Sequence, residues 1–150
     1  EDALFDVVTS VNVACGGHAG DAASMERVVR AALAHGVAVG AHPSYPDREG
    51  FGRRTMRLSL EEVSATVAAQ VAAFLDVARL CGARLAHVKP HGALYNMAAT
   101  DSGLAEAIAR AVRAFDPSLI LFGLPGSALL GLGHGCYLHS LKALLLGEAL

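Results

Sequence analysis

The sequence predicts an α/β fold on a parallel sheet, because an apolar run, a polar loop and a helical pattern follow one another four times. Three of the apolar runs lead into a loop that contains histidine, and no linker or fixed-period repeat interrupts the series. Such alternation gives parallel strands joined by right-handed crossovers. Four units are too few to close a barrel. We therefore expect one domain over residues 1–150, either an open doubly wound sheet or an incomplete portion of a parallel (β/α) barrel.

The first unit begins with residues 6–14, a run rich in Val that predicts a strand. A turn follows over residues 15–21, where two adjacent glycines let the backbone approach a ligand closely. Asp21 is placed to cap the next helix, whose apolar residues recur on one face until Gly36 ends it.

The second unit begins with residues 37–41, whose continuous apolar run is typical of a buried parallel strand. A long loop follows from His42, and loops of this length inside compact domains are usually functional. Ser59 and Glu62 have the spacing of a capping box, which predicts a helix that runs to about Cys81.

The third unit begins with residues 84–88, a predicted strand that leads into residues 87–96. These ten residues hold two His, a Lys, a Tyr and an Asn, and a helix-like pattern follows them. Thr100 or Asp101 is placed to cap a further helix that runs to Phe115.

The fourth unit begins with residues 118–123, a predicted strand that follows the helix break at Asp116 and Pro117. The pattern blurs over residues 131–139, and residues 141–150 are compatible with a short helix.

The composition excludes several classes of protein. The net charge is −2 with no basic cluster, and aromatic residues make up 5% of the chain. These values argue against nucleic-acid binding. No uninterrupted apolar stretch approaches membrane-spanning length, so we expect no membrane partner. The three cysteines are odd in number and widely spaced, which suits the reducing cytoplasm. The chain starts at Glu1 rather than Met, so we expect further residues upstream.

Histidines follow three successive predicted strands. His18, His42 and His91 each lie just beyond a different strand, and the turn of residues 125–127 follows the fourth. Because the carboxyl ends of parallel strands share one edge of the sheet, these residues should lie together. Three such histidines favour a functional site more strongly than one does.

Two chemical roles are open for the three histidines. With a carboxylate such as Asp21 or Asp47, their imidazole nitrogens are suited to a divalent metal that activates water. Alternatively, one histidine is a general acid or base and the others orient a substrate.

Cationic residues beside the histidines are candidate ligands for an anion. Lys89, Arg53 and Arg54 are suited to a carboxylate or phosphate, and arginine can make bidentate contacts. The alternative for the two arginines is a solvated loop.

Other polar residues have weaker assignments. Tyr45 and Asn96 are candidate hydrogen-bond donors to a substrate, or they close their own loops. Asn12 lies within a strand and needs partners if it is buried. Cys15 has His18 nearby, as a nucleophile would, but we expect a buried, inert thiol.

Three segments resemble the LamB/YcsF family, and they occur in the family's order. The segments are residues 12–21 (NVACGGHAGD), 39–54 (VGAHPSYPDREGFGRR) and 87–96 (HVKPHGALYN). The resemblance implies a fold similar to the glycoside hydrolase/deacetylase (β/α) barrel. It further implies the A subunit of a 5-oxoprolinase, which opens 5-oxo-L-proline to L-glutamate at the expense of ATP together with subunits B and C.

The chain departs from the family pattern in three places. It lacks the acidic first strand that members usually carry, and Gly17 stands where an aromatic residue is common. From about Gly131 onward we expect no match, so the chain is interpreted as a fragment without the first strand and the later β/α units.

The implied reaction assigns roles to the candidate residues. His91 or His42 would act as base or metal ligand, Lys89 would offset phosphate or oxyanion charge, and Arg53 or Arg54 would hold the substrate carboxylate. No Walker-type motif is present, so ATP would bind by another geometry or largely on a partner. The alternatives are a metal-dependent carbohydrate deacetylase and a non-catalytic subunit that binds the substrate.

Overall fold

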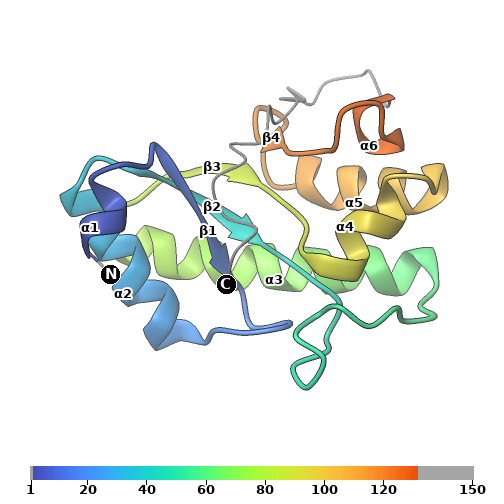
Figure 1. The fold of residues 1–150 in the computed structure, drawn as a ribbon, viewed down its shortest axis with the longest axis horizontal. Helices are drawn as coiled ribbons and strands as arrows, with labels where there is room; N and C mark the ends of the chain where they lie inside the picture. Colours follow the sequence, from blue (N-terminus) through green and yellow to red (C-terminus); the bar gives the residue numbers. More distant parts are fainter. Residues whose placement is uncertain (1, 132–150) are drawn as a thin grey trace.

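A four-stranded parallel sheet forms the centre of the protein in its computed structural model, which describes residues 2–131 (Figure 1). The strand order is β1-β2-β3-β4, and every neighbouring pair is parallel. The predicted α/β fold is therefore confirmed. Sequential order is that of a (β/α) barrel wall, whereas a doubly wound sheet reverses its order at a switch point. The strands are β1 (Ser10–Ala14), β2 (Ala38–His42), β3 (Leu85–Val88) and β4 (Ile120–Leu121).

The helices pack mainly through the long α3, which contacts both α2 and α5 as well as β2 and β3. Val67, Val71 and Phe74 of α3 are fully buried, so the core lies between this helix and the sheet. The helices are α1 (Asp2–Phe5), α2 (Ala22–Ala34), α3 (Leu60–Leu80), α4 (Gly92–Ala98), α5 (Ser102–Arg113) and α6 (Ala128–Gly131).

The helix starts follow the predicted capping chemistry. Asp21 accepts a hydrogen bond from the backbone N–H of Ser24 at the start of α2. Ser59 and Glu62 form the predicted capping box of α3. Asp101, rather than Thr100, caps α5. Each side chain satisfies an N–H group that the first helical turn leaves without an internal partner.

The two outer strands are shorter than the sequence predicts. Strand β1 begins at Ser10, which pairs with Ala38, the first residue of β2. Residues 6–9, which were predicted as part of the strand, therefore have no β2 residue to pair with. That segment instead contacts the end of α2, where His35 lies 3.0 Å from Asp6 and stacks on Phe5. The helix α1 was not predicted. The patterns noted over residues 132–150 lie outside the described residues.

The helix α3 is long and apolar enough to meet a length-and-composition criterion for a membrane span, which inspection of the sequence did not indicate. In this structure one face of α3 packs against the sheet and against α2 and α5, and the opposite face is exposed. Its polar Gln70 is buried and hydrogen-bonded to the backbone of the loop before it.

A polar pair spans the sheet on the face opposite the apolar core positions. Asn12, Gly40 and His87 are neighbours in register, and strand alternation points them away from the side of Val13 and Ala41. The His87 Nε2 atom lies 2.9 Å from Asn12 Oδ1 across Gly40, where any Cβ would overlap the imidazole ring. A glycine at this position therefore permits the pair.

The buried His87 should make stability depend on pH. Burial, with a smaller effect of Lys89, lowers the pKa of His87 to about 4. Between about pH 6.5 and pH 4 the unfolded chain therefore binds a proton that the folded chain does not, so stability falls as pH decreases. His87→Gln should reduce this fall by about 2–3 kcal/mol between pH 7 and pH 4.5, as measured by urea unfolding.

The control for this measurement is the same substitution at an exposed histidine, His35→Gln, at the end of α2. An unchanged pH dependence in His87→Gln, relative to the unaltered chain, would contradict the assignment.

Candidate functional site

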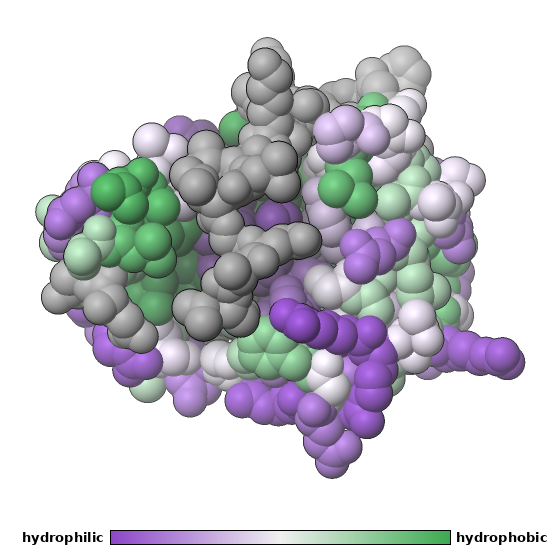
Figure 2. Space-filling view, viewed as in Figure 1, coloured by the Kyte–Doolittle hydropathy of each residue, from purple (hydrophilic) through white to green (hydrophobic). Residues whose placement is uncertain are grey.

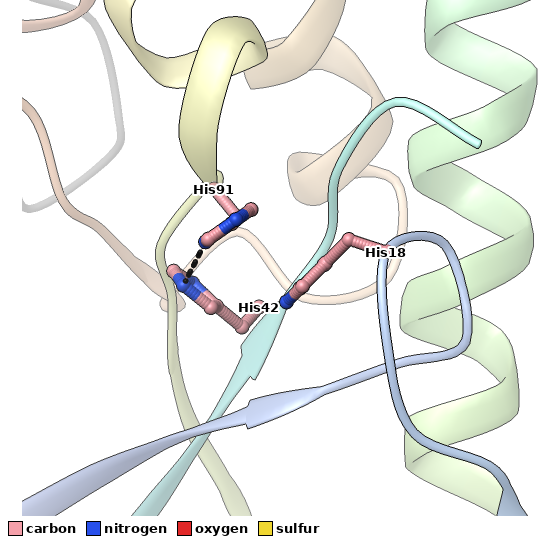
Figure 3. Close-up of side chains that lie close together, drawn as sticks. All are labelled: His18, His42 and His91. Atoms are coloured by element: carbon pink, nitrogen blue, oxygen red, sulfur yellow. Dashed lines mark hydrogen bonds between the residues drawn. The ribbon is translucent and has the colours of Figure 1, made fainter. Parts of the chain in front are cut away.

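Three histidines that end or follow three neighbouring strands meet at the carboxyl ends of those strands (Figure 3). His18 lies in the turn after β1, His42 is the last residue of β2, and His91 is the N-cap of α4. The rings of His18 and His91 stack with centroids 3.8 Å apart, and His42 lies edge-on to both. One ligand atom from each histidine lies within 4.8 Å of the others, so the cluster could form a metal site.

Backbone carbonyls hold two of the three rings. The Nδ1 atom of His42 lies 2.6 Å from the Lys89 carbonyl oxygen. His91 lies between two partners, with Nδ1 3.0 Å from His42 Nε2 and Nε2 2.9 Å from the Phe51 carbonyl oxygen. Their orientation is thus set by hydrogen bonds at both ends of the pair.

Burial keeps the cluster neutral. It lowers the pKa of His42 to about 3 and that of His18 to about 4, with further lowering from the neighbouring histidines. The pKa of His91 is also lowered, first by burial. Neutral imidazoles have lone pairs for a proton or a metal, so at pH 7 the rings are suited to act as ligands, while their lowered pKa values make them weaker bases than free imidazole.

The wall of the site is residues 43–59, which contain no helix or strand. Within this loop, buried Asp47 accepts hydrogen bonds from the backbone of Gly50 and from the backbone and guanidinium of Arg54. The Arg54 guanidinium lowers the pKa of Asp47 to about 2. In this structure Arg54 and Asp47 therefore stabilise the loop, and neither joins the histidine cluster.

Two residues that were not singled out in the sequence fix the loops to their surroundings. Gln70 of α3 donates to the Ser44 carbonyl at 2.7 Å and accepts from the Ser44 N–H at 3.0 Å. Arg48 donates from Nη1 to the carbonyls of Gly16 and Gly20, in the turn that carries His18. A polar residue within the apolar stripe of a helix was the available signal for Gln70.

Gly17 contributes by having no side chain. A Cβ at this position would overlap the side chains of Gln70 and Ser44. The departure from the aromatic residue expected there is thus accommodated by close packing of the loop onto α3.

Phe51 is a further residue that sequence inspection did not identify. Its φ of 54° is in the left-handed region, which is unusual for a residue other than glycine. This backbone conformation accompanies the hydrogen bond of its carbonyl to His91, and its ring packs edge-on against His18 and His91. Strained residues concentrate at functional sites.

The cationic candidates divide into two groups. The Arg53 guanidinium lies 5.8 Å from the centre of the Phe51 ring, is exposed, and makes no ion pair within residues 2–131. Lys89 is half-buried, with Nζ 5.7 Å from the centre of the Tyr95 ring, and burial lowers its pKa. The exposed side chains of the loop form part of the polar lower edge in Figure 2.

The remaining candidate residues make hydrogen bonds outside the histidine cluster or are exposed. Tyr45 is buried, and its hydroxyl donates to Met97 Sδ at 3.5 Å. Asp21 caps α2, and Asn96 is exposed on α4. The exposed Asn12 pairs with His87 on the sheet.

Cys15 has the features of an inert thiol. Its Sγ is buried between the Val13 carbonyl and the His42 N–H, and burial raises its pKa to about 12. A thiol with a raised pKa is a poor nucleophile.

The fold and the cluster together define an α/β protein with a histidine-rich candidate active site at the carboxyl ends of its parallel strands. The chain belongs to the LamB/YcsF family, whose model matches residues 1–145. The matched range extends beyond Gly131, where we expected the resemblance to end.

Relatives and a solved structure agree with this membership. The chain is 54% identical over 140 residues to the 5-oxoprolinase A subunit of Geobacillus kaustophilus, covering 93% of this chain and 55% of that protein. It is 57% identical over 130 residues to the 5-oxoprolinase A subunit of Bordetella pertussis, covering 87% and 52%. The crystal structure of the lactam utilization protein from Thermus thermophilus matches with a TM-score of 0.84 and 52% identity, covering 87% of this chain and 53% of that one. The chain spans about half the length of these relatives.

Proposed function

We propose that this chain supplies a catalytic part of the A subunit of a 5-oxoprolinase, which opens 5-oxo-L-proline to L-glutamate with hydrolysis of ATP. The observation that carries the proposal is the convergence of His18, His42 and His91 at one end of the sheet, in a chain similar to proteins named as that subunit. Partner subunits B and C and a cytoplasmic location follow from the same proposal.

The need for ATP follows from the chemistry of the substrate. The amide of 5-oxoproline is a weak electrophile, and transfer of the γ-phosphoryl group of ATP to its oxygen would activate the ring carbon. ADP leaves in that transfer. Attack by one water then lets the C–N bond break, with a proton passing to the ring nitrogen, and leaves an acyl phosphate. A second water hydrolyses the acyl phosphate to the carboxylate of glutamate and free phosphate. Such steps need a base for water and positive charge near the phosphoryl oxygens.

The described residues provide groups for each of these tasks. A neutral His91 or His42 would take the proton from water, and Lys89 would offset the charge that develops on oxygen. Arg53 would bind the substrate carboxylate, since its guanidinium is exposed beside the site and free of ion pairs within residues 2–131. Arg54 is a weaker candidate because Asp47 already engages it. We propose that ATP binds on another part of the complex, or on this chain in a geometry different from that of the Walker loop.

Reconstitution of the full-length protein with subunits B and C tests the proposal. Glutamate and phosphate should form together, only with 5-oxoproline, ATP and all three subunits present. Arg53→Gln should raise the KM for 5-oxoproline about 10- to 100-fold, because one charge-assisted hydrogen bond is lost. Arg57→Gln is the matched control, since Arg57 is exposed in the same loop.

The test also separates the alternatives. Glutamate formation that survives every change in the histidine cluster, with 5-oxoproline still bound, would indicate a non-catalytic binding subunit. Release of acetate from an N-acetylated sugar without ATP would instead indicate the deacetylase.

A further inference from the structure

The hydrogen bonds around His42 and His91 leave two lone pairs facing each other. Carbonyl oxygens only accept hydrogen bonds, so the contact with Lys89 needs a proton on His42 Nδ1 and the contact with Phe51 needs one on His91 Nε2. A neutral imidazole carries one proton. The remaining nitrogens, His42 Nε2 and His91 Nδ1, then face each other at 3.0 Å as two acceptors.

The third ring adds another unsatisfied nitrogen. His18 is 4% exposed, and its Nδ1 has no hydrogen-bond partner among the described residues. Buried nitrogens without partners are rare in folded proteins, because each costs free energy. All three rings therefore present nitrogen lone pairs or unmet bonding capacity at one place, which a single cation would satisfy.

We propose that His42 Nε2, His91 Nδ1 and a ring nitrogen of His18 bind one divalent transition-metal ion of the zinc or cobalt class. Imidazole nitrogens suit these ions, whereas Mg²⁺ and Ca²⁺ prefer oxygen. Two nitrogens about 2.0–2.1 Å from a tetrahedral zinc ion lie roughly 3.3 Å apart, close to the separation of the His42 and His91 nitrogens. The His18 and His91 rings stack with an interplanar angle of 10°, so one of them must turn out of the stack for both to direct a nitrogen at the same ion, and this turn also closes the wider separations of up to 4.8 Å.

The carbonyls of Lys89 and Phe51 have the arrangement of outer partners at metal sites. Histidine ligands usually donate their second ring N–H to a carbonyl or carboxylate, which fixes the tautomer that coordinates. Both His42 and His91 have such a partner on the nitrogen away from their shared contact. Three protein ligands would leave one position open, as in catalytic rather than structural zinc sites.

The inference rests on the same site as the proposed function, and metal titration of the full-length protein without its partners tests it independently of ring opening. After removal of metals with a chelator, Co²⁺ should bind at one ion per chain with the visible absorption of a tetrahedral site, and Zn²⁺ should displace it. His42→Ala and His91→Ala should each weaken binding by more than about 100-fold, beyond the usual loss from an outer partner. His35→Ala should leave binding unchanged.

A second measurement does not rely on the folding of the variants. Imidazole ¹⁵N resonances of the unaltered protein should shift on Zn²⁺ addition for His42 Nε2 and His91 Nδ1. Three results would overturn the inference. They are a lack of stoichiometric Co²⁺ binding, Co²⁺ binding by His42→Ala or His91→Ala as tight as that of the unaltered protein, and a proton that stays shared between these two nitrogens in excess Zn²⁺.

Discussion

His91→Ala in the reconstituted complex is expected to lower glutamate formation by at least about 100-fold, the lower range for loss of a general acid or base. The imidazole contacts His42 and the Phe51 carbonyl and stacks on His18, so its removal takes away a base and the central member of the cluster. The measurement is the rate of 5-oxoproline-dependent glutamate and phosphate release, with kcat and KM determined separately.

The matched control for this variant is His35→Ala. His35 lies at the end of α2 beside Phe5 and Asp6, outside the histidine cluster. Unchanged glutamate formation in a folded His91→Ala complex would exclude a catalytic role for this residue.

Gly92→Ala is expected to lower the free energy of unfolding by about 3 kcal/mol, as the sum of left-handed backbone strain and overpacking. Gly92 has a φ of 59°, and a Cβ there would overlap the Gly52 carbonyl oxygen. That oxygen also accepts the hydrogen bond of the Ala93 N–H at 2.9 Å. Two segments of backbone must separate to admit the methyl group, so the change should also displace His91. Urea unfolding measures the effect.

Gly82→Ala separates the two contributions to this loss. Gly82 has a φ of 74°, yet a Cβ there would meet no atom of residues 2–131 within 4 Å. This control should therefore lose only about 1–2 kcal/mol, the backbone penalty. Equal losses in the two variants would show that the contact between Gly92 and Gly52 is not tight.

The fold was largely predictable because local signals and the core pattern agree along most of the chain. Capping residues such as Asp21 and Ser59 act within one helical turn, so sequence spacing is sufficient to find them. Strand β1 was predicted too long because its start depends on where β2 offers a partner. Helix α1 has only four residues, too few for a periodic signal.

The site was predictable only where topology governs position. The strand-end rule pointed to His18, His42 and His91, and the structure brings these residues together. The roles of Gln70 and Phe51 depend on contacts between distant segments and on a single backbone dihedral angle. No local pattern encodes such contacts.

Because the loop of residues 43–59 is already ordered in the folded protein, its conformational entropy is lost on folding rather than on ligand binding. It has no regular secondary structure, yet Gln70 ties it to α3, Asp47 braces it internally, and Gly52 joins it to the start of α4. Fixing one residue's backbone costs about 1–2 kcal/mol of conformational entropy, and these bonds place that cost in the folding equilibrium. A small ligand that meets a wall already in place keeps more of its contact energy as affinity.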